Sequence, residues 1–330
     1  MTRKAVKAGL AGLVFLVFGI WLLGPREPVR LSISYDQSEA QNQLKTTDLD
    51  AYLAEREGQF DDIIDGVEKQ IIWAGEAGVK TQISIVYLHG FTATSKEIRP
   101  VPDQLAAGLG ANLYLGRFTG HGRRAPMALA DATVARWMDD VGEAVKIGGQ
   151  LGDRVFIIAT STGGTLAAAA ALDTAAVEKV AGIIFISPNF AIRSRAASLL
   201  TWPFARQWVP LVVGSWQKGS PRNEQHARYW TIEYPTTALM PMAAIVAAVD
   251  AQSFADVQIP ALFYYSREDQ VVVPEKIAAF AKSWGGPAKT IIARMTAADD
   301  KFSHIIAGDI VSPNQTQAAV GHFLAWIKDL

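Results

Sequence analysis

Residues 156–171 read Phe-Ile-Ile-Ala-Thr-Ser-Thr-Gly-Gly-Thr-Leu-Ala-Ala-Ala-Ala-Ala, and this stretch decides the fold. An apolar run typical of a buried strand passes through small residues into an alanine-rich segment typical of a helix. Ser161 lies at the apex of Ala159-Thr160-Ser161-Thr162-Gly163, a variant of the Gly-x-Ser-x-Gly nucleophile elbow. Small residues flank such a serine because the strand and helix backbones almost touch. A plain helix N-cap is the alternative interpretation of Ser161, and the rest of the chain must decide.

Composition excludes several classes of protein. A chain of 330 residues with 50% hydrophobic residues can bury one large domain or two ordinary ones. The formal net charge of −1, without a basic cluster interleaved with aromatic residues, argues against a nucleic-acid partner. The absence of cysteine excludes disulfides, zinc–cysteine sites and thiol catalysis. The five histidines show no metal-ligand spacing, so we expect neither a metal ion nor a cofactor.

The N-terminus has the features of a membrane anchor. Three basic residues among the first seven positions precede an uncharged apolar stretch from Ala8 to Pro25, with Trp21 near its end. Such a stretch is just long enough to cross a bilayer and has no polar face, unlike a helix of a soluble protein. We therefore predict a transmembrane signal anchor over residues 1–25, with the catalytic domain exported. Secretion after cleavage of a signal peptide is the alternative, although no small-x-small cleavage site follows the stretch.

Strand and helix patterns alternate along the rest of the chain, without internal repeats. This alternation predicts an α/β fold with a mostly parallel, doubly wound sheet and helices on both faces. We assign residues 26–68 to a spacer and an N-terminal helix, and residues 69–188 and 260–330 to the core. Strands are expected at 69–74, 82–88, 112–118, 154–160, 180–187, 261–265 and 290–295. Helices are expected at 49–66, 130–149, 163–172 and 237–249, from Pro274 onward, and at 313–326, the last capped by Ser312.

Residues 189–259 interrupt this rhythm. They hold four of the nine tryptophans, several turns such as Lys218-Gly-Ser-Pro-Arg222, and one apolar helix. An enlarged core is one interpretation. We prefer a helical cap inserted over the catalytic face, since its aromatic residues would suit an acyl chain or another apolar part of a substrate.

An oxyanion hole is predicted next to the serine. The strand at 82–88 runs directly into His89-Gly90-Phe91, so the backbone amide of Phe91 can point at a developing oxyanion. The amide of Thr162 would supply the second donor. His89 is expected to hold this loop by hydrogen bonds, and His121, in Gly120-His121-Gly122, is expected to be part of a turn near the site.

A serine nucleophile needs a base and a group that orients the base. Asp269 and His304 each follow a strand, and carboxyl ends of parallel strands meet at one edge of a sheet. The order Ser161, Asp269, His304 is the one that the elbow predicts. Glu268 and Asp250 are the alternative acids. Asp299 and Asp300 are too close to His304 in sequence to orient its ring. His322 lies within a helix rather than in a loop.

With these motifs in place, residues 69–330 resemble the α/β-hydrolase superfamily, specifically the capped serine hydrolases of the monoglyceride lipase, lysophospholipase and carboxylesterase kind. The resemblance rests on His89-Gly90-Phe91, Gly120-His121-Gly122, the Ser161 elbow, Asp269 and His304. Ala159 departs from the usual glycine but is still small. A serine at the apex argues against the dehalogenases and epoxide hydrolases of the same fold.

The resemblance implies a carboxylic-ester hydrolase that forms an acyl-enzyme on Ser161, with a small-molecule, lipid-like or otherwise apolar ester as its partner. A peptidase, a thioesterase or an acyltransferase could use the same triad, because these reactions differ in the acyl group or in the nucleophile that attacks the acyl-enzyme. A non-catalytic binding module is the alternative from another class, and the presence of every triad member argues against it.

Overall fold

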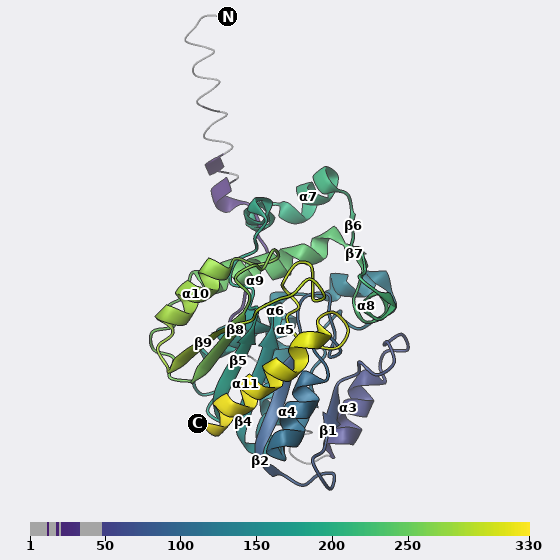
Figure 1. Ribbon diagram of the computed structural model, residues 1–330. Helices are drawn as coiled ribbons and strands as arrows, with labels where there is room; N and C mark the ends of the chain where they lie inside the picture. The colour runs from purple at the N-terminus through teal and green to yellow at the C-terminus, as the bar shows by residue number, and fades with distance from the viewer. Residues whose placement is uncertain (1–11, 13–17, 20, 34–47) are drawn as a thin grey trace, which may run out of the picture.

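A seven-stranded sheet forms the centre of the molecule (Figure 1). The structure is a computed structural model and describes residues 12, 18–19, 21–33 and 48–330. The strands lie in the spatial order β1-β3-β2-β4-β5-β8-β9. Their bounds are β1 Gln70–Ile72, β2 Thr81–Leu88, β3 Asn112–Leu115, β4 Gly152–Thr160, β5 Val180–Ile186, β8 Ala261–Tyr265 and β9 Ala288–Ile292.

The sheet is mostly parallel, which confirms the predicted α/β fold. Only β1 runs antiparallel to its neighbour β3, and the other strand pairs in this sheet are parallel. The register pairs Leu88 at the end of β2 with Ala159 of β4, and Ala159 with Phe185 of β5. The carboxyl ends of the three central strands therefore meet at one edge of the sheet, where the loops after them can share a site.

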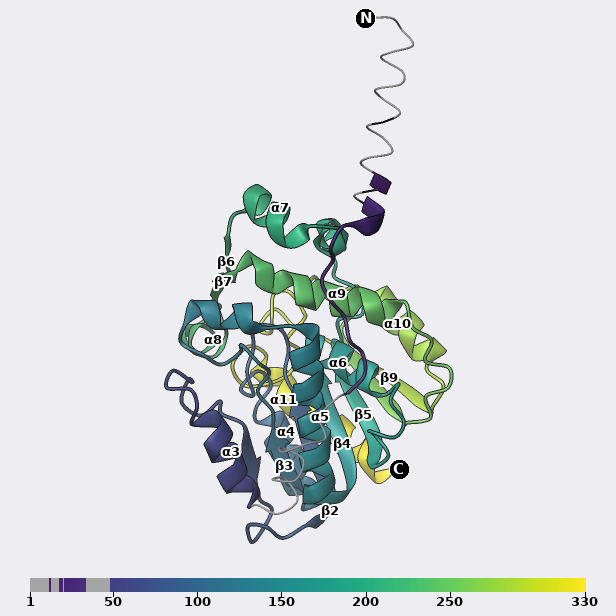
Figure 2. The ribbon, with the colours of Figure 1, turned by 180° about the vertical axis from the view of Figure 1, so that it is seen from behind.

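Helices cover both faces of the sheet, as Figures 1 and 2 show from opposite sides. Along β4, Phe156 and Ile158 pack with α4 and α11, whereas Val155, Ile157 and Ala159 pack with α5, α6 and α10. Both faces are thus buried, which explains why the central strands read as continuous apolar runs. The bounds are α4 Val101–Leu109, α5 Val134–Leu151, α6 Thr162–Ala170, α10 Pro274–Ser283 and α11 Thr316–Lys328.

The segment between β5 and β8 lies over the carboxyl ends of the strands (Figure 1). We call residues 189–259 the cap. It contains a two-stranded antiparallel sheet of β6 and β7, and its helix α9 packs against α6 of the core. The bounds are α7 Ala205–Val213, β6 Trp216–Lys218, α8 Glu224–Tyr229, β7 Glu233–Pro235 and α9 Leu239–Asp250.

Two local predictions were wrong. The helix expected over 49–66 is α3, Leu49–Glu57, because Gly58 ends it and the chain turns to form a bridge between Ile63 and Arg123. Ser312 does not cap the final helix with its side chain, since its hydroxyl donates to the Ile305 carbonyl instead.

The predicted membrane anchor falls largely outside the described residues. Within the part of the chain that the structure describes, no helix combines the length and the apolar character needed to cross a membrane. Described residues 25–27 contact the cap, because Phe204 N donates to the Pro25 carbonyl at 2.8 Å and Arg206 forms a two-point ion pair with Glu27.

Gly163 tests the close approach of α6 to β2. A Cβ atom there would lie 2.5 Å from the Leu88 carbonyl oxygen and 2.6 Å from that of His89. Helix propensity alone favours Gly→Ala by about 1 kcal/mol. We nevertheless expect Gly163→Ala to lower the free energy of unfolding by about 1–3 kcal/mol, as overpacked cores do.

The matched control is Gly149→Ala in α5, where the added methyl group would meet only the flexible Lys179 side chain at 3.2 Å. This variant should be neutral or slightly stabilised in urea-induced unfolding. Equal effects of the two substitutions would show that the backbones around Gly163 can separate at little cost.

Candidate active site

Ser161 occupies a tight turn between β4 and α6. Its backbone has φ 50° and ψ −116°, a strained conformation for a residue with a side chain. Its amide donates to the Ile186 carbonyl at 2.9 Å, which ties the turn to the end of β5. The side chain makes no capping hydrogen bond to α6, so the N-cap interpretation was wrong. The hydroxyl oxygen lies 3.0 Å from Nε2 of His304 instead.

His304 joins Ser161 to Asp269. Its Nδ1 lies 2.8 Å from Oδ2 of Asp269, and the second oxygen, Oδ1, accepts from the amides of Val271 and Val272 at 2.8 and 2.9 Å. Asp269 is fully buried and so presents one fixed oxygen to the ring. Burial lowers the pKa of His304, but the adjacent Asp269 carboxylate outweighs burial and raises it overall. Such an imidazole is well suited to accept a proton from the serine.

The alternative residues lie away from this arrangement. Glu268 is exposed, and Asp250 forms an exposed ion pair with Lys276 at 2.7 Å. His322 is exposed on α11, as expected. Asp299 accepts hydrogen bonds from Thr296 and Gln315 rather than from a histidine ring. Among the candidates, the structure therefore brings together Ser161, His304 and Asp269.

The predicted oxyanion donors border the same cavity as Ser161. Thr162 is the first residue of α6, so its amide has no intrahelical acceptor, and the amide of Phe91 has no hydrogen-bond acceptor among the described residues. His89 holds the loop as predicted: Nδ1 donates to the Gly90 carbonyl at 2.8 Å, and Nε2 accepts from Phe118 N at 3.1 Å. Burial lowers the pKa of His89 well below its usual range, which keeps the ring neutral.

His121 packs behind this loop rather than at the serine. Its ring lies beside those of His89 and Phe91, with centroids 5.0 and 6.0 Å away. Burial lowers its pKa to about 4. His121 does not border the cavity that contains Ser161, which agrees with its expected place in a turn.

The cavity lies between the cap and the strand ends and has a volume of about 360 Å³. Ser161, Thr162 and His304 form part of its floor. Its walls combine apolar and aromatic side chains with a few polar ones. Those walls include Phe91, Glu97, Asn189, Ile192, Ser220, Arg222, His226, Trp230, Tyr234, Met242, Val271 and Phe302.

Asp300 supports the loop that carries His304 in a way that sequence reasoning did not find. Its carboxylate accepts from the backbone amides of Phe302, His304 and Ile305 at 3.0–3.2 Å, and from Nε of Arg222 at 2.8 Å. It therefore fixes the backbone that carries His304 without touching the imidazole. Asp300 is too close to His304 in sequence to orient the ring, but the same closeness allows it to bind the backbone amides of the His304 loop.

Glu97 is a second residue that the sequence did not reveal. It is buried in the cavity wall, and its Oε2 accepts from the Gly90 amide at 2.7 Å and from the Tyr87 hydroxyl at 3.0 Å. Gly90 precedes Phe91, so this carboxyl group fixes the turn that presents the predicted oxyanion donor. Burial raises the pKa of Glu97 to about 7, although the Gly90 hydrogen bond opposes this rise.

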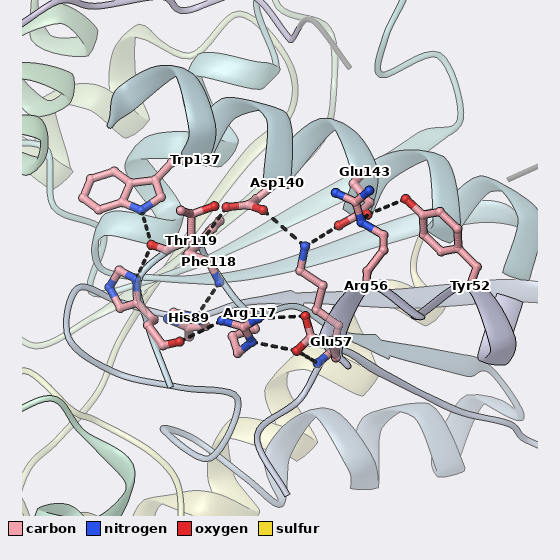
Figure 3. A network of polar contacts seen from close by, with 12 residues as sticks. Tyr52, Arg56, Glu57, His89, Arg117, Phe118, Thr119, Trp137, Asp140 and Glu143 are labelled. Atoms are coloured by element: carbon pink, nitrogen blue, oxygen red, sulfur yellow. Dashed lines mark hydrogen bonds and ion pairs between the residues drawn. The ribbon is translucent and has the colours of Figure 1, made fainter. Parts of the chain in front are cut away.

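Buried ion pairs support the same loops from the N-terminal side (Figure 3). Glu57 at the end of α3 accepts from Nε and Nη2 of Arg117 at 2.7 and 2.8 Å, and Nη1 of Arg117 donates to the His121 carbonyl. Beside them, Lys69 forms an ion pair with Glu143 of α5. Burial lowers the pKa of Lys69, but the neighbouring carboxylates outweigh burial and raise it above its usual range.

This network reaches the turn at residues 89–91, the predicted oxyanion turn, through Phe118 and Thr119. Asp140 of α5 accepts from the Thr119 amide at 2.7 Å, and the preceding amide, that of Phe118, donates to His89. The assignment of residues 26–68 to a spacer remains a prediction. Its last part, α3, is nevertheless tied by buried charges to the loops behind the site (Figure 3).

Comparisons with known proteins agree with this geometry. The protein has the fold and the side-chain arrangement of a serine hydrolase of the α/β-hydrolase superfamily. A family model described as serine aminopeptidase, S33, matches residues 80–297, and the chain belongs to that family. No curated protein matches the sequence.

Solved structures share the fold at low sequence identity. One described with the metagenome-derived lipolytic enzymes LipS and LipT is 21% identical with a TM-score of 0.62, covering 81% of this chain and all of the other. A soluble variant of the Saccharomyces cerevisiae monoglyceride lipase is 13% identical with a TM-score of 0.58, covering 80% and 92%. A Paleococcus ferrophilus monoacylglycerol lipase is 16% identical with a TM-score of 0.54, covering 79% and 98%.

The buried carboxyl group of Glu97 predicts a pH dependence of stability. Its folded-state pKa of about 7 exceeds its ordinary value of 4.5. As the pH rises between these values, the unfolded chain releases this proton while the folded chain keeps it, so stability falls by about 3 kcal/mol in total. Above pH 7 Glu97 no longer contributes to the change of stability with pH. Glu97→Gln should remove this contribution because an amide does not titrate, and the amide oxygen can still accept a hydrogen bond from Gly90.

Urea-induced unfolding at pH 5 and pH 7.5 measures the effect, with the exposed Glu55→Gln variant as the control. A wild-type slope that persists unchanged in Glu97→Gln would mean that another group causes it.

Proposed function

We propose that this protein is a serine carboxylic-ester hydrolase that acts through an acyl-enzyme on Ser161. One observation carries the proposal: His304 lies 3.0 Å from the Ser161 hydroxyl and 2.8 Å from Asp269, and both His304 and Ser161 line one cavity. A buried acid, a base and a serine at these distances are the arrangement required to activate a weak nucleophile.

The reaction would proceed in two halves. In the first, Nε2 of His304 takes the hydroxyl proton as Ser161 Oγ attacks the ester carbonyl. The amides of Phe91 and Thr162 would stabilise the oxyanion, a contribution of about 3 kcal/mol for each donor. His304 then gives its proton to the leaving alcohol as the carbon–oxygen bond breaks. In the second half, His304 deprotonates a water molecule, which attacks the acyl-enzyme. His304 then returns this proton to Ser161 Oγ as the bond between the acyl carbon and Oγ breaks and the acid leaves.

The walls of the cavity support an apolar acyl group. Ile192, Met242 and Val271 line the cavity together with Asn189. The Asn189 side-chain amide lies 3.5 Å from the Met242 sulfur, and its backbone amide donates to the Ser161 carbonyl at 3.0 Å. An acyl chain attached to Ser161 could bury its apolar surface there, which favours binding by roughly 25 cal/mol for each Å² removed from water. Lipid-like esters fit these walls better than highly polar acyl groups do.

An aminopeptidase is the second candidate. The amino group of a peptide substrate would need a carboxylate, and Glu97 borders the cavity. However, Glu97 already accepts hydrogen bonds from Gly90 and Tyr87, and its raised pKa favours the neutral form. Comparing a butyrate nitrophenyl ester with an aminoacyl nitroanilide would separate the two: faster turnover of the anilide would favour the peptidase.

Labelling with a fluorophosphonate probe tests the nucleophile. The folded wild-type protein should label, and Ser161→Ala should not, because the probe reacts only with an activated serine. His304→Ala should lower kcat for nitrophenyl butyrate by roughly 10⁴-fold or more.

His121→Ala is the matched control, since His121 lies behind the oxyanion turn and should leave most of the turnover intact. Equal labelling of wild type and Ser161→Ala would overturn the assignment of the nucleophile. Loss of turnover in His121→Ala but not in His304→Ala would reassign the base.

We further propose that the N-terminal segment anchors the exported protein to a membrane. The described residues 25–27, which follow the apolar stretch, bind to the cap beside α7. At the end of that helix, Leu211, Val212 and Val213 are exposed, the first at 86%. An apolar surface next to the end of an apolar N-terminal stretch supports attachment to lipid on this side.

Expression of the whole chain followed by membrane fractionation tests the anchor. The protein should remain in the membrane fraction after washing with carbonate at high pH and should keep its N-terminal residues in Edman sequencing. A mature chain that begins after residue 24 and appears in the soluble exported fraction would instead support a cleaved signal peptide.

A further inference from the structure

The cavity has two chemically different sides. Ile192, Met242 and Val271 form the apolar side described above. Arg222 and His226 form a polar side contributed by the cap, where the Arg222 amide donates to Nδ1 of His226 at 3.2 Å. Neither polar residue has a role in the triad or in the predicted oxyanion hole.

The polar side adjoins the catalytic base. Arg222 donates through Nε to Asp300, and the same carboxylate accepts from the His304 amide. The guanidinium also lies over the Phe302 ring, with Cζ 4.9 Å from the ring centroid. Arg222 is thus fixed on the loop that carries His304.

Chemistry then decides which part of an ester faces Arg222. His304 must give its proton to the leaving oxygen, so the alcohol portion has to lie on the His304 side of the reacting carbon. The acyl portion stays on Ser161, and Ile192 and Met242 offer it an apolar surface in the same cavity. The polar side of the cavity is therefore the side that receives the alcohol portion.

The donors on this side can bind an anion. Among the described residues, Nε is the only guanidinium nitrogen of Arg222 that donates a hydrogen bond, which leaves Nη1 and Nη2 for a ligand. The Asp300 carboxylate also accepts hydrogen bonds from three backbone amides, so Arg222 is not the sole group that balances its negative charge. Burial and the nearby Arg222 lower the pKa of His226 to about 4, so its ring is neutral. Since Nδ1 accepts a hydrogen bond, the proton is on Nε2, which becomes another donor.

We propose that Arg222 and His226 form an alcohol-side subsite that binds a phosphate or carboxylate group on the leaving alcohol. Arg222 supplies the charge and a planar pair of donors, and His226 supplies a neutral donor beside it. The preferred substrate is then an ester with an apolar acyl group and an anionic alcohol. This inference rests on the proposed ester hydrolysis and adds the substrate class of the same site.

A matched pair of esters isolates the charge. The butyrate esters of 4-hydroxybenzoate and of 4-hydroxybenzamide have the same shape and differ in the charge of the group attached to the leaving phenol. The wild-type kcat/KM should favour the benzoate ester by roughly 10-fold or more, the typical value of one charge-assisted hydrogen bond. Arg222→Gln should abolish this preference, and Arg222→Lys should restore part of it.

The preference, rather than the rate, is the diagnostic readout. Arg222→Gln also removes a hydrogen bond to Asp300, so it should slow both esters to a similar extent through the His304 loop. Arg228→Gln is the matched control, because Arg228 is exposed on α8, lies against Tyr229 and does not border the cavity. It should leave both the rate and the preference unchanged.

A second pair of substrates, used below their micellar concentrations, distinguishes binding of a phosphate group from binding of a carboxylate group. Hexanoyl lysophosphatidate and monohexanoylglycerol share the acyl chain, and only the former has a phosphate. A higher kcat/KM for hexanoyl lysophosphatidate than for monohexanoylglycerol indicates a phosphate subsite. A preference seen solely for the butyrate ester of 4-hydroxybenzoate indicates a carboxylate subsite.

Equal kcat/KM within both pairs, or a preference that survives Arg222→Gln, would overturn the subsite. Absence of any Ser161-dependent turnover, including that of nitrophenyl butyrate, would instead overturn the proposed function itself.

Discussion

Three strand ends meet in backbone contact at Ser161, and the rest of the site depends on this contact. The turn donates to the Ile186 carbonyl at the end of β5, and Gly163 lies against the carbonyls at the end of β2. No larger residue fits there, and the serine itself adopts a positive φ that costs roughly 1–3 kcal/mol. The surrounding sheet maintains this strain, because all three strands are buried on both faces.

The loops around Ser161 also need contacts on the side away from the cavity, and buried ion pairs provide them. Removing one partner of the Glu57–Arg117 pair would leave an uncompensated charge, a change that typically costs about 3–5 kcal/mol. The pair holds the turn around His121, which in turn contacts His89 and the oxyanion loop. A helix outside the residues matched by the family model thereby becomes part of the structure that supports the candidate site.

Local patterns predicted the residues of the candidate site but not the contacts that support them. The elbow around Ser161 was recognisable because its constraint falls on consecutive residues, and the strand ends placed Asp269 and His304. Glu57–Arg117 and Arg222–Asp300 join residues far apart in sequence, so no spacing reveals them. Ser312 had the local pattern of an N-cap, but its hydroxyl is drawn into tertiary hydrogen bonds with Asp300 and Ile305.

Asp300 connects the two parts of the molecule that such enzymes must combine. The core fixes the reacting atoms through strand ends, and a cap can vary in sequence without disturbing that geometry. Here one carboxylate is shared between the His304 backbone and Arg222 of the cap, so the residue proposed to bind the alcohol also supports the loop that carries His304, the proposed base. In the proposed reaction, substrate recognition and proton transfer are therefore linked through a single buried group, and a change in the cap at this position should affect both.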